Sequence, residues 1–347
     1  MYGRHLQYIR VSDDRAILKR GASELLLSGE RVHALVEPLV PMLDGSQSRQ
    51  QIVESFPEDE REEIGELLES LLRRRMITEG SEPDTGEPSL HSMQAAFWWN
   101  FGEMAGQAPE RLRQAHIVVV GANLISRALI RSLLETGVGR LTLVDHAALN
   151  NEVARLNPDA GEGQKISRVP ELPSGDELAE ASLLCAASDF GQPDALLEVN
   201  RAALHAGKPF LPVWLDDLRG YVGPLNYPYE SACLRCYRAR VDSNNEDYRT
   251  ARAVRQYIGE NPQARSSAGL LPPMPAILGE IAAAETTKFI AGFPPCDTVG
   301  RIVEINLVSF ASTVRRVLKL PRCPDCSEIM RKATRAITIG PLIPHSE

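Results

Sequence analysis

The sequence predicts an α/β protein: a Rossmann-like domain that carries a four-cysteine zinc site, preceded by a small winged-helix-type α+β domain. Three observations lead to this fold class. Strands of β-branched residues alternate with amphipathic helices from about residue 112 onward. Short strand-like runs, followed by helices, occupy the first 80 residues. Two Cys-x-x-Cys pairs lie far apart in the second half of the chain.

Composition narrows the class of protein. The 347 residues are 43% apolar and 24% charged, as in ordinary globular chains. The sequence has no run of about 18 apolar residues and no secretory signal at its start, so we expect a cytoplasmic protein that does not bind membranes. The formal net charge of −8 argues against nucleic acid as a partner.

The first domain is predicted to span residues 1–80. Strand-like runs at 6–11, 15–20 and 24–27 are separated by turn residues, and three apolar stripes with helical spacing follow between residues 32 and 71. Three strands and then three helices give a winged-helix-type outline. Residues 81–94 begin with a polar segment that contains proline and glycine, which is typical of a linker.

The second domain is predicted to span residues 95–330, with a tail at 331–347. A buried strand at 117–120, a helix at 124–135 and a strand at 141–144 form a βαβ unit. Further strands are expected at 183–186 and 209–213. A helix near 248–257, a long helix from residue 275 and a terminal hairpin at 302–318 complete the domain.

The two Cys-x-x-Cys pairs predict a zinc site. Cys233 and Cys236 form one pair, and Cys323 and Cys326 form the other. In a reducing cytoplasm such pairs are better metal ligands than disulfides. Four thiolates would surround Zn²⁺ tetrahedrally and leave no position for a reactive water, so the site would be structural. The alternative is two unrelated pairs of buried cysteines.

The turn after the first strand of the βαβ unit lacks most of the glycines that a phosphate needs. A phosphate-binding turn reads G-x-G-x-x-G, and here only Gly121 matches. Asn123 and Leu124 place side chains where phosphate would lie. Asp145, at the end of the next strand, could still bind a ribose hydroxyl. The alternative is an ordinary turn between sheet and helix.

Together these motifs resemble the ThiF/MoeB superfamily of ubiquitin-activating-like enzymes over residues 95–330. That resemblance implies a domain that binds MgATP and adenylates a carboxylate. Its nucleotide-binding residues would correspond here to Gly121, Asn123, Asp145, Arg155, Lys165 and Asp189. The family's second acidic residue falls on Ala147, and its glycines fall on Asn123 and Leu124, so the resemblance implies a decayed ATP site.

The first domain resembles the PqqD-like peptide-recognition fold, through the segments 25–29 and 43–46. Such domains bind the leader of a ribosomal precursor peptide by adding it to a sheet edge beside a helix. The binding residues implied here are Glu24, Leu25, Leu26 and Leu27 on the edge strand and Ile64, Leu67, Leu71 and Arg74 on the helix. A winged-helix DNA reader is the alternative, and the acidic segment 58–63 counts against it.

A PqqD-like unit joined to a decayed ThiF-like unit resembles the ocin-ThiF-like leader-binding proteins of azoline and thiopeptide biosynthesis. This resemblance implies a zinc-containing homodimer, without catalytic activity of its own, that presents a precursor peptide to a YcaO-type cyclodehydratase. The alternative is an active peptide-adenylating enzyme of the ThiF/MoeB type, as in microcin or pantocin pathways, with ATP and Mg²⁺ as cofactors.

Overall fold

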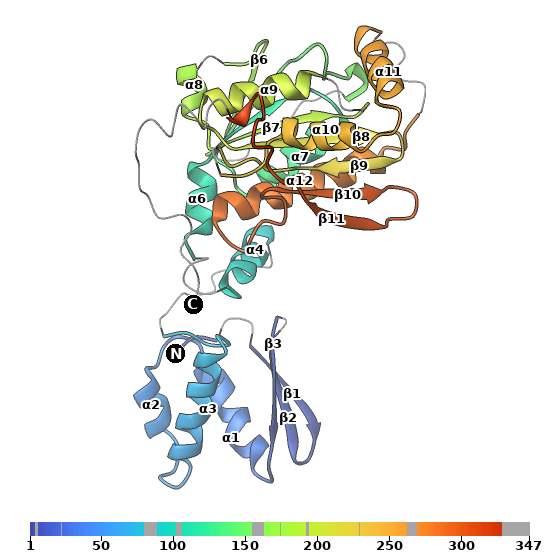
Figure 1. Ribbon diagram of the computed structural model, residues 1–347. Coiled ribbons are helices and arrows are strands. Elements are labelled where there is room, and N and C mark those ends of the chain that lie inside the picture. The colour runs from blue at the N-terminus through green and yellow to red at the C-terminus, as the bar shows by residue number, and fades with distance from the viewer. Residues whose placement is uncertain are drawn as a thin grey trace. The chain divides into compact units, whose positions relative to one another are not determined.

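The computed structural model in Figure 1 divides the chain into two compact units, residues 1–106 and 107–347. It describes residues 1–3, 6–21, 23–79, 89–101, 106–154, 163–173, 175–191, 194–228, 230–261 and 269–327. Each unit has a sheet and a hydrophobic core of its own, and each is described here by itself.

The first unit contains a three-stranded antiparallel sheet in the order β1-β2-β3. Its strands are β1 (Gln7–Ser12), β2 (Arg15–Arg20) and β3 (Ser23–Ser28). Alternate residues of β2 point inward, and Ala16 and Leu18 are fully buried. The helices α1 (Val32–Leu39), α2 (Arg49–Glu54) and α3 (Arg61–Arg73), with the 3₁₀ turn η1 (Val40–Met42), complete the unit.

These elements bury one hydrophobic cluster. The apolar stripes of α1 and α3 supply nearly half of it, because residues three and four apart share one helix face. Its buried members are Met1, Ala16, Leu18, Val32, Leu35, Val36, Leu39, Leu43, Ile52, Phe56, Ile64, Leu68, Leu71, Met76 and Ile77. A small antiparallel sheet with helices is what the sequence predicts for this unit.

Helix α4 (Leu90–Trp99) falls within the first unit, whereas the sequence places it in the linker and the second domain. The Trp99 ring packs on Tyr2, with ring centroids 5.6 Å apart, and the Arg20 guanidinium lies 3.9 Å from the Trp99 ring centroid. These contacts attach α4 to the N-terminal sheet. Residues 81–88 of the expected linker, and residue 80 before them, lie outside the described residues.

The second unit contains an eight-stranded mixed sheet in the order β11-β10-β9-β8-β7-β4-β5-β6. The parallel strands are β4 (His116–Val120), β5 (Arg140–Val144), β6 (Lys165–Val169), β7 (Leu183–Ser188) and β8 (Phe210–Asp216). An antiparallel extension consists of β9 (Arg219–Val222), β10 (Arg301–Asn306) and β11 (Ser312–Arg316). The expected α/β class is therefore confirmed, and β6 and β9 are strands that the sequence does not predict.

Helices cover both faces of this sheet. α7 (Leu124–Glu135) and α12 (Pro273–Ala291) pack together on one face, where the Cys185 side chain of β7 contacts Thr286 of α12. α9 (Asp194–His205) and α10 (Leu234–Ser243) share the other face and its hydrophobic cluster. The remaining helical segments are α6 (Ala108–Gln114), η2 (Glu152–Ala154), α8 (Gly175–Ala179) and α11 (Tyr248–Glu260). In the described part of the chain, none of the helices has the length and apolar character that a membrane crossing requires.

Close packing of α7 on α12 depends on Gly279. A Cβ at this position would lie 2.5 Å from the Ile125 carbonyl oxygen and 2.7 Å from the Ala128 Cβ. We expect Gly279→Ala to lower the free energy of unfolding of the second unit by about 1–3 kcal/mol, because the two helices must move apart.

Gly65 in α3 is the matched control, since nothing lies within 4 Å of a Cβ there. Gly65→Ala should raise the free energy of unfolding of the first unit by about 0.5–1 kcal/mol, through the lower entropy of the unfolded chain. Differential scanning calorimetry of both variants checks the opposite signs. Equal effects would contradict the proposed α7–α12 contact.

Candidate functional site

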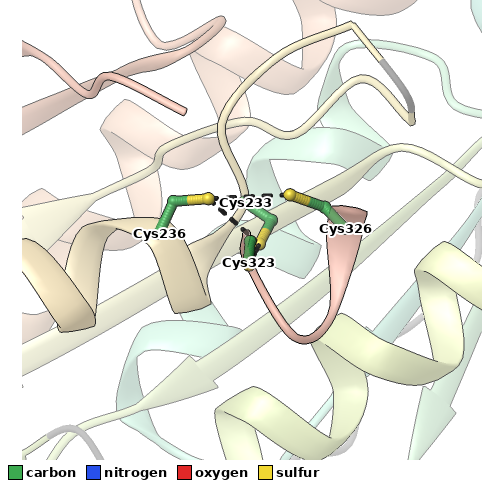
Figure 2. Close-up of side chains that lie close together, drawn as sticks. All are labelled: Cys233, Cys236, Cys323 and Cys326. Atoms are coloured by element: carbon green, nitrogen blue, oxygen red, sulfur yellow. Dashed lines mark hydrogen bonds between the residues drawn. The ribbon is translucent and has the colours of Figure 1, made fainter. Parts of the chain in front are cut away.

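The two Cys-x-x-Cys pairs meet in one buried cluster on the sheet face covered by α9 and α10 (Figure 2). Cys233 is the N-cap residue of α10, and Cys236 lies in the first turn of that helix. Cys323 and Cys326 lie on the turn that follows the β10–β11 hairpin. The hairpin thus brings the second pair to the start of α10 across 90 residues of sequence.

The geometry of the cluster suits a tetrahedral metal. The Sγ–Sγ distances are 3.9 Å for Cys233–Cys236, 3.7 Å for Cys233–Cys323 and 3.6 Å for Cys236–Cys326, and all four sulfurs lie within 4.8 Å of one another. Four sulfurs at about 2.3 Å from Zn²⁺ would be about 3.8 Å apart. The four cysteines can therefore hold a metal, as the sequence predicts, and Zn²⁺ fits both the spacing and the ligand type.

A hydrogen bond from Cys233 lowers the pKa of the Cys323 thiol to about 6, which favours the thiolate that a metal requires. The Leu320 N–H also donates to the Cys236 sulfur at 3.4 Å. The thiolate form is therefore favoured at Cys236 and Cys323, whereas hydrogen bonding within the cluster raises the pKa of Cys233 and Cys326.

Asn200 of α9 joins the two cysteine turns. Its Oδ1 accepts a hydrogen bond from the Leu234 N–H at 3.1 Å, and its Nδ2 donates to the Asp325 carboxylate at 3.3 Å. Leu234 lies inside the first Cys-x-x-Cys turn and Asp325 inside the second. Arg235 also approaches Asp325, with 3.7 Å between Nε and Oδ2. Sequence reasoning missed this support, since a single helical asparagine has no distinctive pattern.

The two other cysteines lack the properties of a nucleophile. Cys185 is fully buried, and burial raises the pKa of its thiol to about 12. Burial likewise raises the pKa of Cys296 to about 12. Neither thiol is therefore activated at neutral pH.

The turn between β4 and α7 is closed by the chain's own side chains. Asn123 is fully buried; its Nδ2 donates to the carbonyl oxygens of Leu149 at 3.0 Å and Ala187 at 2.7 Å. Its Oδ1 accepts from the Ser126 N–H at 3.1 Å and so caps the helix. The asparagine therefore occupies the space beside the helix start, where a phosphate would bind.

Asp189, which directly follows β7, accepts a hydrogen bond from another amide of this helix start. The Leu124 N–H and the Asn151 Nδ2 both donate to its Oδ2 at 3.0 Å. The carboxyl group is buried, and burial raises its pKa. Gly121 and Ala122 donate their own amides to Val144 O at 2.9 Å and Asn150 Oδ1 at 2.8 Å. Four amides of the turn, those of residues 121, 122, 124 and 126, therefore already have acceptors.

Asp145 is engaged by an arginine that the sequence did not identify. Arg168 of β6 donates to both carboxylate oxygens of Asp145, at 2.8 and 2.7 Å, and Asn150 adds a bond at 3.2 Å. The hydrogen bonds from Arg168 lower the pKa of Asp145. A ribose hydroxyl would compete with this bidentate pair.

Of the other two expected nucleotide residues, the structure places Lys165 away from this turn. Lys165 begins β6 and pairs with Arg140 at the start of β5, so it lies at the edge of the parallel sheet opposite Asp145. The expectation that it joins Gly121, Asp145 and Asp189 is wrong for this structure, because the register of β6 fixes it elsewhere. Arg155 lies outside the described residues.

The proposed peptide edge, β3, has a partner strand on one side only among the described residues. Gly29 N–H donates to Asp14 O at 2.8 Å, which continues the β2–β3 ladder. Bonded pairs alternate along an antiparallel ladder. In the register Ala16↔Leu27 and Leu18↔Leu25, the backbone groups of Glu24, Leu26 and Ser28 therefore point to the open side.

The expected groove residues divide into two groups. Leu25 and Leu27 of β3 and Leu67 of α3 are partly buried against the core, so they retain surface for a ligand. Ile64 and Leu71 are fully buried core residues, which corrects the expectation that they line an open groove. Arg74, just beyond α3, is exposed. Periodicity identifies the apolar face of α3, and the core already covers most of that face.

A cavity of about 760 Å³ opens beside α9, α10 and α11. Sequence reasoning missed it, because its walls come from three helices and the segment after β5. Arg255 pairs with Asp242 at 2.7 Å, and Arg238 pairs with Asp194. The lining residues are His146, Ala148, Asp194, Ala195, Glu198, Arg235, Arg238, Asp242, Tyr248, Arg252, Arg255, Gln256 and Glu260. Arginines and acidic residues are equal in number there, so the cavity presents no excess of either charge.

We expect the purified chain to contain zinc and Cys326→Ser to lose it, since three thiolates hold Zn²⁺ far less tightly than four. The melting temperature of the second unit should fall with the metal. Cys296→Ser is the control, because Cys296 lies outside the cluster. Metal analysis by mass spectrometry checks both variants, and full zinc content in Cys326→Ser would refute the four-cysteine assignment.

Asn200→Ala should keep all four cysteine ligands but make the two turns that carry them less rigid. Loss of the amide leaves the Leu234 N–H and the Asp325 carboxylate without this partner, which we expect to lower the free energy of unfolding by about 1–3 kcal/mol. Outer-shell changes of this kind weaken metal binding by about 10–100-fold. The rate of zinc transfer to a chromogenic chelator measures the effect, and an unchanged rate would show that Asn200 does not support the cage.

Residues 147–328 match the ThiF family. The sulfur carrier protein adenylyltransferase of Thermus thermophilus is 24% identical over 251 residues, which cover 65% of this chain and 87% of that protein. The molybdopterin-synthase adenylyltransferase of Escherichia coli is 22% identical over 244 residues, which cover 63% and 90%.

Two solved structures share the fold over most of this chain. Escherichia coli MccB, solved with AMPCPP and MccA, has a TM-score of 0.66 at 16% identity, covering 94% of this chain and 99% of MccB. A heterocyclase solved with substrate and cofactor has a TM-score of 0.60 at 21% identity, covering 94% of this chain and 39% of the heterocyclase. Since the family match spans more than half of the residues, the chain belongs to the ThiF family.

Proposed function

We propose that this protein is a leader-binding scaffold of ribosomal peptide natural product biosynthesis, which presents a precursor peptide to a separate YcaO-type cyclodehydratase. The observation that carries the proposal is the closed turn before α7. Amides that would bind a nucleotide phosphate are bonded instead to Asp189, Asn123 and Asn150. A ThiF-family domain closed in this way favours binding over adenylation.

The closed turn disfavours ATP for a simple reason. A helix start attracts phosphate through its unbonded amides and its partial positive charge. In this chain the Asp189 carboxylate already supplies a negative group at the Leu124 amide, at 3.0 Å. A phosphate would have to displace it and then lie beside it, so the two negative groups would repel each other.

A magnesium ion is disfavoured at the same place. Mg²⁺ prefers octahedral oxygen ligands and usually keeps several waters. Asp189 is buried, with one oxygen bonded to Leu124 and Asn151, and Ala147 supplies no second carboxylate. The residues present therefore fit a closed structural turn better than a MgATP site.

The peptide would bind at the β3 edge of the first unit. Open backbone groups of Glu24, Leu26 and Ser28 provide hydrogen bonds for an added strand, and Leu25, Leu27 and Leu67 provide partly exposed apolar surface on the helix side. Similarity to MccB, solved with MccA, and to a heterocyclase solved with substrate supports a peptide-related role.

The proposal of a separate partner enzyme rests on how much of the heterocyclase this chain matches. This chain corresponds to 39% of the heterocyclase, so a separate protein would supply the remaining chemistry here. A homodimer formed through the second unit is part of the same proposal. The four-cysteine site, with zinc bound, would hold the β10–β11 hairpin on the body that the partner recognises.

An active adenylating enzyme is the second candidate, favoured by the two curated relatives, which are adenylyltransferases. It would require Asp189 and Asn123 to leave the helix start when ATP binds. ATP–pyrophosphate exchange separates the candidates. We expect no exchange above background with the purified protein and peptides encoded by short reading frames beside its gene. Exchange that depends on Asp189 would overturn the scaffold proposal.

Leader binding is tested with a fluorescein-labelled peptide from the same reading frames. Glu24→Pro removes one outward N–H from the open edge of β3, while Glu24→Ala keeps it. Because proline is tolerated where the N–H faces solvent, both variants should fold. We expect fluorescence anisotropy to show at least about tenfold weaker binding for Glu24→Pro than for Glu24→Ala. Equal affinities would exclude strand addition at β3.

A further inference from the structure

An apolar row crosses the outer face of the N-terminal sheet. Ile9 of β1 pairs with Ile17 of β2, and Ile17 pairs with Leu26 of β3, so the three side chains lie side by side across the strands. This is the face away from the buried residues Ala16 and Leu18. The row is solvent-exposed at both ends, where Leu26 is 58% and Ile9 40% exposed.

The row is bounded by polar residues in the same register. On one side the pairs are Gln7↔Lys19 and Lys19↔Glu24, and Lys19 forms an ion pair with Glu24. On the other side Arg15 pairs with Ser28. An added strand would therefore meet one apolar position on this outer face, beside Leu26, with polar positions two residues away in either direction.

We infer that Leu26 is a specificity-determining residue that selects an apolar side chain at the leader position directly opposite it. This inference rests on the proposed function, since it concerns the strand that pairs with β3. Outward backbone groups of Leu26 bond that strand, and directly opposed side chains on one face of a sheet lie about 4.5–5.5 Å apart between Cβ atoms. The leader residue opposite Leu26 thus extends the row Ile9–Ile17–Leu26 by one member.

The two faces of a bound leader strand then contact different parts of the first unit, the outer face of the sheet and its helix side. Successive residues of a strand point to opposite faces, so the leader residues on either side of that position turn toward the helix side of the sheet. There they meet Leu25, Leu27 and Leu67, which are partly buried. The ligand class that follows is an extended peptide with three consecutive apolar residues, flanked by polar residues where the outer face presents Glu24 and Ser28.

The test uses a bacterial display library of random short peptides, selected on the full-length protein and on Leu26→Lys. Because Leu26 is largely exposed, the lysine variant should fold as the wild-type protein does, which circular dichroism and melting temperature verify. We expect wild-type selections to enrich three consecutive apolar residues. Selections on Leu26→Lys should replace the middle one by Asp or Glu, since opposite charges pair across strands.

Ile9→Lys is the matched control, because Ile9 lies on the same row but is separated from the added peptide by β2 and β3, beyond direct contact. Selections on Ile9→Lys should enrich the same three consecutive apolar residues as selections on the wild-type protein. A labelled wild-type consensus peptide should bind Leu26→Lys about tenfold more weakly and Ile9→Lys with unchanged affinity. An unchanged pattern on Leu26→Lys would overturn the inference. If Glu24→Pro still bound more weakly than Glu24→Ala, strand addition itself would stand, whereas no enrichment on the wild-type protein would count against peptide binding altogether.

Discussion

The amides at the start of α7 need acceptors, and the way this chain supplies them governs the rest of the second unit. A helix start leaves several N–H groups without intrahelical partners. In this chain Asp189, which directly follows β7, and Asn123 from the turn itself accept two of them. Because Asn123 also bonds the carbonyls of Leu149 and Ala187, the turn is tied to the loop after β5 and to the last residues of β7. The carboxyl edge of the sheet is thereby closed at its centre.

The glycine that remains in this turn has a structural explanation. Gly121 has a φ of +95°, and a Cβ there would lie 2.7 Å from the Leu149 Cβ and 2.8 Å from the Ala187 carbonyl oxygen. Glycine is thus required by the left-handed backbone and by the close approach of two neighbouring segments. Its presence is no sign of phosphate binding, and the sequence alone could not separate these two reasons.

Signals repeated along the chain made much of the fold predictable. The β-branched strand at 116–120, the helix after it and the two Cys-x-x-Cys pairs all follow from spacing and residue type. Contacts between single polar residues could not be predicted. Arg168 engages Asp145 from β6, a short strand of mixed composition that the sequence does not reveal. Asn200 supports the cysteine turns from a helix whose sequence gives no sign of that role.

The N-terminal unit shows the same limit in its apolar residues. Helical spacing correctly groups Ile64, Leu67 and Leu71 on one face of α3, yet only Leu67 keeps exposed surface there. Whether an apolar face is covered depends on the packing of α1, α2 and the sheet, which periodicity does not encode. Leu26 is the complementary case, since strand alternation places it on the outer face while Leu25 and Leu27 turn inward.

Competition for the α7 amides also determines how readily a nucleotide could bind at this turn. A phosphate would gain the Leu124 N–H only by taking it from Asp189, so this amide contributes little net free energy to nucleotide binding. The displaced carboxylate would then need a new partner, and its other oxygen, Oδ1, is already buried without a hydrogen-bond partner among the described residues. Opening the turn thus exchanges a formed bond for an equivalent one and adds the cost of moving a buried carboxylate. The closed turn is therefore the stable state of this region, and the proposed peptide binding at β3 does not require it to open.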